Sequence, residues 1–149
     1  MVAAAVKAAV PTRVYAVQLG GFDTHADEKG TQQRQLQTLD EAVVPFLREM
    51  AGDRYGRNVV LLVYSEFGRR VRANASHGTD HGTAGPVFVA GAPVKGGFYG
   101  EEPSLTDLDN GDLKFTTDFR DVYAELLART VGTDPTPSVG AGRQSLGFL

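Results

Sequence analysis

The sequence predicts an α/β fold built on a largely parallel sheet. Residues 13–19 and 58–64 are nearly continuous apolar runs rich in β-branched side chains, which is typical of strands buried on both faces. Between them, residues 36–50 place apolar side chains at steps of three and four, the period of a helix face. Strand, helix and strand in this order predict a βαβ unit with a right-handed crossover.

The remaining elements follow from shorter patterns. Residues 1–10 resemble the end of an amphipathic helix, and residues 86–90 predict a short third strand that begins with proline. Residues 118–131 predict a second helix that ends at Gly132. Glycine, proline and serine then dominate residues 133–149, so we expect an irregular tail there.

Composition excludes several classes of function. The 149 residues carry 15 basic and 18 acidic side chains, interspersed along the chain, which argues against a nucleic-acid-binding patch. The absence of cysteine excludes disulfides, thiol catalysis and zinc held by thiolates. No run approaches the roughly 18 apolar residues of a membrane span, and the N-terminal residues lack the pattern of an export signal.

Chemistry-bearing residues occur in three loops. Asp23 and His25 follow the first predicted strand in a glycine-led loop, and a carboxylate and an imidazole at this spacing can face one cation. An equally good alternative is that Asp23 forms an Asx turn and His25 only begins the helix.

The second loop follows the most apolar predicted strand and contains Glu66, Arg69 and Arg70. A carboxylate at the end of a buried strand should be paired or metal-bound, because an isolated buried charge is costly. Glu66 therefore either binds a cation or pairs with one of the arginines. Arg69 and Arg70 either clamp an anionic substrate or form a solvated face.

The third loop contains His77, Asp80 and His81 among glycines and threonines. His81 is the best ligand candidate of the three. His77 is a candidate substrate contact, and Asp80 either binds the metal directly or orients an imidazole. Because parallel strands end at the same sheet edge, we expect the loops to converge there on a metal site.

Several segments, in order, resemble a known family. GGFDTH at residues 20–25, VVLLVYSEFGRR at 59–70 and GTDHGTAGPVFVAG at 78–91 are similar to the C-terminal part of the domain-of-unknown-function 1501 family, sulfatase-like proteins of the alkaline phosphatase superfamily. The resemblance implies a three-layer α/β/α sandwich on a mixed, mostly parallel sheet. It assigns residues 1–132 to this domain and residues 133–149 to the tail.

The resemblance also implies roles for individual residues. Asp23, His25 and His81 match ligands of the first metal in the superfamily. The Asp-His pair of the second metal falls on Glu66 and Phe67, and Phe67 cannot bind a cation. The second site is therefore degenerate, rebuilt with Asp80 or His77, or absent. The superfamily's nucleophile and another metal-binding aspartate lie in a region that precedes the part matched here, and complete relatives often carry an export signal.

The resulting hypothesis is a fragment of a metal-dependent hydrolase of phosphate or sulfate esters, incomplete without its nucleophile region. A divalent metal would be held by Asp23, His25, Glu66, Asp80 and His81. Zinc is the expected metal, and manganese and calcium are alternatives. The alternative function is an inactive binding or scaffold module with the same fold. Because two or three strands are few for such a sheet, we expect a homo-oligomer or a partner that completes it.

Overall fold

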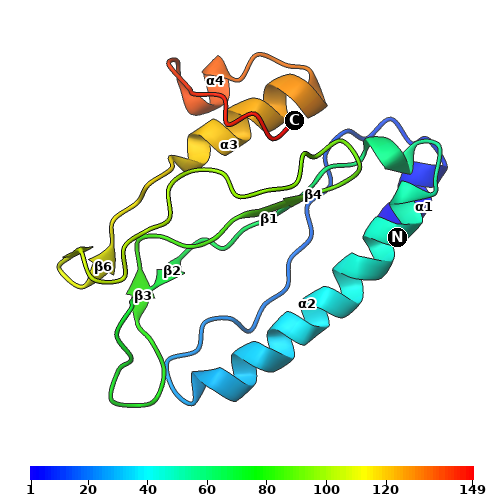
Figure 1. Cartoon of the computed structure of the whole chain (residues 1–149). Helices are drawn as coiled ribbons and strands as arrows, with labels where there is room; N and C mark the ends of the chain where they lie inside the picture. The colour runs from blue at the N-terminus through cyan, green and yellow to red at the C-terminus, as the bar shows by residue number, and fades with distance from the viewer.

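The computed structural model describes all 149 residues and contains one long helix, one long hairpin and a C-terminal helical segment (Figure 1). The helices are α1 (Val2–Lys7), α2 (Glu28–Ala51), the 3-10 helix η1 (Gly56–Asn58), α3 (Phe119–Leu126), the π-helix η2 (Leu127–Val131) and α4 (Thr136–Val139). The strands are β1 (Leu61–Val63), β2 (Gly68–Arg69), β3 (His81–Gly82), β4 (Phe88–Ala90), β5 (Leu108–Asp109) and β6 (Asp112–Leu113).

The central feature is a hairpin that runs from β1 to β4. Leu61 pairs with Ala90, and Val63 with Phe88, in an antiparallel ladder. Further along the same two arms, β2 pairs with β3 in the same antiparallel sense. Figure 1 shows the two ladders in succession along one elongated pair of chain segments, with the loop of residues 70–80 at its tip.

The predicted parallel sheet and three-layer sandwich are wrong. Each sheet has two strands, and every pair is antiparallel. The predicted strands at residues 58–64 and 86–90 exist in shorter form as β1 and β4. An apolar run signals a buried strand but not the direction of its partner, and the chain turns back on itself after β2, so the third run returns antiparallel to the second.

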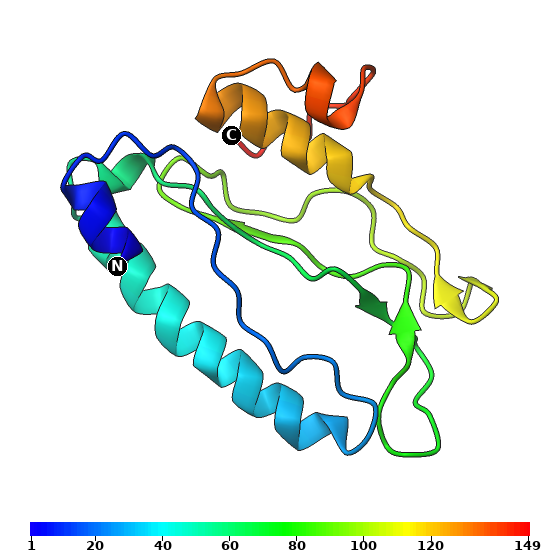
Figure 2. The same cartoon turned by 180° about the vertical axis from the view of Figure 1, so that it is seen from behind.

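Residues 13–19 explain the failure of the βαβ prediction. They form no ladder and no backbone hydrogen bond, although Figures 1 and 2 both draw them as an extended segment between α2 and the β1–β4 hairpin. Val14 and Val17 are 66% and 78% exposed there. The segment has the extended path expected of a strand but no partner.

The helical predictions are confirmed. The helix expected within residues 36–50 is part of α2, which continues through Pro45. The helix expected at residues 118–131 is α3 followed by η2, and it ends at Gly132 in the left-handed conformation. The side chain of Asp118 caps α3 by accepting a hydrogen bond from the Arg120 amide, which satisfies one of the orphan donors of the first turn.

The C-terminal tail is irregular apart from α4, and a buried carboxylate anchors it. Glu125 of α3 is 5% exposed and accepts hydrogen bonds from the amides of Leu146, Gly147 and Leu149. Phe148 is 3% exposed in the same region. The tail is thereby held against α3 (Figure 2).

Little of the chain is buried. Only Met50, Val122, Ala124 and Phe148 form a buried hydrophobic core, and the accessible surface is 10503 Å². A compact monomer of this size exposes about 7,400 Å². The fold therefore leaves about 3,000 Å² more surface uncovered than a compact domain would. None of the helices has the length and apolarity needed to cross a bilayer.

Candidate metal centre

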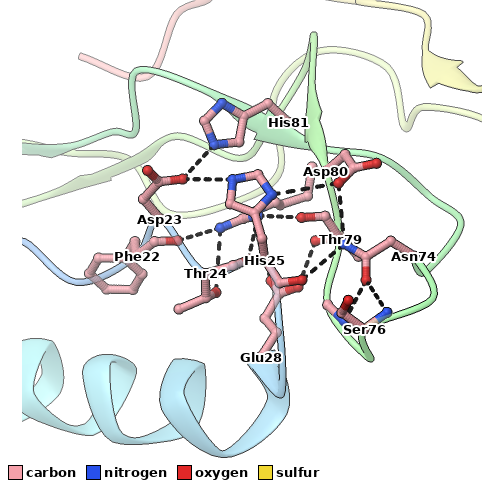
Figure 3. Close-up of polar contacts among 12 residues, drawn as sticks. Phe22, Asp23, Thr24, His25, Glu28, Asn74, Ser76, Thr79, Asp80 and His81 are labelled. Atoms are coloured by element: carbon pink, nitrogen blue, oxygen red, sulfur yellow. Dashed lines mark hydrogen bonds and ion pairs between the residues drawn. The ribbon is translucent and has the colours of Figure 1, made fainter.

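One loop and one strand bring three ligand-type side chains together. Asp23 and His25 lie in the loop that leads into α2, and His81 is the first residue of β3. The antiparallel pairing of Arg69 with His81 places His81 at the end of the hairpin that faces this loop. Figure 3 shows the three side chains pointing toward one another, with His25 between Asp23 and Asp80.

Both imidazoles meet the same carboxylate oxygen. Asp23 Oδ1 lies 2.7 Å from His81 Nε2 and 3.0 Å from His25 Nε2. One ligand atom from each of the three residues lies within 4.8 Å of the other two. In a tetrahedral zinc site with bonds of about 2.1 Å, ligand atoms are about 3.4 Å apart. The three side chains therefore need only small displacements to face one cation.

The donor chemistry also fits a divalent metal. One carboxylate oxygen and two imidazole nitrogens form a set that suits zinc or manganese. All three side chains are exposed, so the site leaves room for water or an anion beside them. Calcium, which prefers six to eight oxygen ligands, fits this donor set poorly.

Asp80 lies beside the triad rather than in it. Its Oδ1 atom is 3.5 Å from His25 Nδ1, the nitrogen opposite the one that faces Asp23. With a metal in place of the Asp23 contact at Nε2, a carboxylate at Nδ1 would favour the tautomer that leaves Nε2 free to bind that metal. Asn74 donates a hydrogen bond to Asp80 and another to the His25 carbonyl, so it holds both partners.

Hydrogen bonding explains the charge state of both carboxylates. The hydrogen bond from His81, supported by that from His25, holds the pKa of Asp23 below its usual value. The Asn74 amide and then His25 lower the pKa of Asp80 in the same way. Both groups are therefore anions at neutral pH, the form that a cation requires.

Arg69 joins the loops that carry the triad. Its guanidinium donates hydrogen bonds to the carbonyls of Phe22, Thr24 and Thr79. The Arg69 Nε atom also lies 3.7 Å from Glu28, whose carboxylate accepts a hydrogen bond from the Thr79 hydroxyl. These contacts use the donors of Arg69 within the protein, whereas the sequence analysis offered it as a clamp for an anionic substrate or as part of a solvated face.

The loop after β2 docks on the start of α2. The carbonyls of Ser76 and His77 accept hydrogen bonds from the Asp27 and Glu28 amides, which are orphan donors at the helix N-terminus. Gly78 fits where no side chain could, because a Cβ atom there would lie 2.5 Å from the His25 carbonyl group. Close backbone contact therefore sets the position of His25.

The other predicted site residues lie apart from the triad. Glu66 lines a different cleft, of about 200 Å³, together with Tyr64, Phe119 and Tyr123. Arg70 lies 3.4 Å from Asp112, and the His77 side chain is exposed. The structure thus brings together Asp23, His25 and His81, with Asp80 adjacent, and it does not bring Glu66 into the triad's group of ligand atoms.

Sequence reasoning missed three contributors: Glu28, Asn74 and the aromatic ring of Phe67, which stacks on His81. Neither Glu28 nor Asn74 is part of the residue patterns from which the metal site was predicted. The run of short polar and glycine residues between Asn74 and Gly82 was the one available signal, since such loops carry hydrogen-bonded turns.

Comparison with known proteins gives one result. The profile of a family described as "Protein of unknown function (DUF1501)" matches residues 2–144. No curated protein and no solved structure matches the chain. Because the match covers nearly the whole sequence, the chain belongs to the DUF1501 family.

Proposed function

We propose that the chain binds a divalent metal, zinc or manganese, through Asp23, His25 and His81, and that this centre serves the hydrolysis of phosphate or sulfate esters. The observation that carries the proposal is the convergence of both Nε2 atoms on one oxygen of Asp23. The ester class comes from the resemblance to sulfatase-like proteins. A divalent cation at such a centre polarises a phosphoryl or sulfuryl oxygen and lowers the pKa of an attacking group.

The surroundings support a centre that lacks a nucleophile of its own. No hydroxyl group forms a hydrogen bond with any of the three side chains. The nearest hydroxyl in sequence, that of Thr24, faces the Arg69 guanidinium, and the Thr79 hydroxyl donates to Glu28. Turnover would therefore need a nucleophile from another part of a larger assembly, or a metal-bound water.

Thermal unfolding with zinc and an inorganic anion tests the proposal. Phosphate or sulfate should raise the melting temperature further when zinc is present and have little effect alone, because an anion that occupies an open metal position stabilises only the loaded form. Asp23→Asn should lose both effects. Stabilisation by the anions that is the same with and without zinc, or absent when zinc alone stabilises, would count against ester chemistry here.

A second candidate function is that of a binding or scaffold module, and the uncovered surface favours it. Val17, Phe88 and Phe119 are 78%, 61% and 62% exposed, and the residue 13–19 segment has no ladder partner. Extended segments with free backbone groups pair readily with further strands, from a second copy or from another protein. Light scattering over a range of concentrations measures self-association. If the chain is a scaffold, self-association should be the same in wild type and in His81→Ala.

A further inference from the structure

The Phe67 ring lies flat against the His81 imidazole. The ring centroids are 4.0 Å apart and the planes differ by 5°. On the same ring, the Arg69 guanidinium carbon lies 5.2 Å from the centroid, within the range of a cation–π contact. Phe67 therefore contacts both the imidazole of the metal centre and the arginine that joins the surrounding loops.

The strand register accounts for this arrangement. Phe67 is the residue immediately before β2, and its ring contacts the side chains of both Arg69 and His81. Arg69 and His81 are paired directly across the ladder, and directly opposed residues also share a face. The ring contacts of Phe67 with Arg69 and His81 place it on the same side of this strand pair. The pairing of Gly68 with Gly82 keeps the two strands close beside them.

His81 needs such support. Its side chain is 44% exposed, and its only hydrogen bond is to Asp23, whose side chain is 66% exposed. A surface imidazole with one exposed partner has freedom to leave the geometry that a metal requires. A flat apolar ring against one face restricts the rotation of the imidazole while leaving Nε2 directed at Asp23.

We propose that Phe67, held in place by Arg69, is a positioning residue that fixes the His81 imidazole for metal binding. The inference rests on the proposed metal centre, but the stack itself is a property of the metal-free chain. Phe67 has no ligand atom, so its contribution is to the orientation of His81. Removal of the ring should lower the affinity for the metal without removing any ligand. Other groups that orient metal-binding histidines have the same kind of effect.

Proton NMR of the metal-free chain tests the stack. The Phe67 ring current should shift the imidazole carbon-bound protons of His81 upfield, and Phe67→Leu should abolish that shift. Phe98→Leu is the matched control, because Phe98 is fully exposed and stacks on no aromatic ring. His81 proton shifts that are the same in Phe67→Leu and wild type would overturn the proposal, whatever the chain does with metals.

Zinc titration and the visible absorbance of bound cobalt test the consequence. Phe67→Leu should raise the Kd for zinc about tenfold and change the cobalt bands, Phe67→Tyr should restore both, and Phe98→Leu should match wild type. Circular dichroism checks that each variant is folded. If wild type binds zinc and Phe67→Leu binds it equally well, Phe67 has no positioning role although the metal centre stands. If folded wild type binds no zinc, the metal centre itself fails.

Discussion

His81 Nε2 lies 2.7 Å from Asp23 Oδ1, although 58 positions separate the two residues in the chain. The contact joins the loop before α2 to the first residue of β3, so it forms only when the hairpin and the helix are both in place. It is the shortest of the three polar contacts among the triad and Asp80. A metal at this position would consequently link folding to binding.

The first prediction separates the two exposed histidines of the third loop. His81→Ala should abolish the rise in melting temperature that zinc produces, because it removes a ligand. His77→Ala should keep that rise, since only the His77 backbone contacts α2 and its side chain lies outside the triad. Differential scanning fluorimetry with and without zinc measures both. Equal loss of the zinc effect in the two variants would contradict the assignment of ligands.

The second prediction concerns the close approach of Gly78 to His25. Gly78→Ala places a Cβ atom 2.5 Å from the His25 carbonyl group, so the loop or His25 must move. We expect zinc affinity to fall about tenfold, the size of effect found when support of a metal ligand is disturbed. Gly96→Ala is the control, because nothing lies within 4 Å of its Cβ position. Unchanged zinc affinity in a folded Gly78→Ala variant would show that this contact does not set the position of His25.

The third prediction concerns the buried carboxylate that anchors the tail. Glu125→Gln should cost about 2–3 kcal/mol in the free energy of unfolding, because charge-assisted hydrogen bonds to the tail amides are lost or weakened. It should also make residues near Phe148 more susceptible to proteolysis. Urea denaturation and limited proteolysis measure the two effects. Glu102→Gln serves as the control, because Glu102 is exposed.

The fourth prediction is the pH dependence of the same anchor. Burial raises the pKa of Glu125, but the amides of Leu149, Gly147 and Leu146 lower it by more, so the net shift is downward. A lowered folded-state pKa contributes stability that is present above the unfolded value of about 4.3 and lost as pH falls through the folded value. Wild type should therefore lose more stability than Glu125→Gln below about pH 4.5. An equal loss of unfolding free energy in the two proteins as the pH falls would contradict this.

The fifth prediction concerns turnover. The zinc-loaded chain should hydrolyse aryl phosphates and aryl sulfates negligibly, because a bound metal without a positioned nucleophile supplies only part of the rate enhancement. A chromogenic assay with His81→Ala as the background control measures this. Hydrolysis that is robust, requires metal and is lost in His81→Ala would show that the chain contains a complete active site.

The sequence predicted the helices, and the convergence of Asp23, His25 and His81, better than the sheet. The helical period around Phe46 and the stop signal at Gly132 are local, and local patterns set helices. The pairing of β1 with β4 is a long-range choice, and apolar runs carry no information on strand direction. Asp23, His25 and His81 nevertheless meet. The antiparallel hairpin brings His81 to the loop of Asp23 and His25, where a parallel sheet had been expected to do so.

The supporting contacts of the site had no comparable signal. The part played by Arg69 depends on three carbonyls that approach it from separate loops, and no residue pattern records the position of a carbonyl. Glu66 lies in a different cleft because the chain continues past it into β2 instead of ending at a sheet edge. Its role as a ligand of a second cation remains a prediction.

Calorimetric titration of zinc into the folded chain at about pH 7.5 tests the metal centre most directly. We expect saturable binding of one zinc per chain in wild type and in His77→Ala, and no saturable binding in Asp23→Asn or His81→Ala. Circular dichroism of each protein establishes that it is folded. Two results would contradict a metal centre formed by Asp23, His25 and His81. One is folded wild type that gives only heats of dilution up to high micromolar zinc. The other is folded His81→Ala that binds zinc as tightly as wild type does.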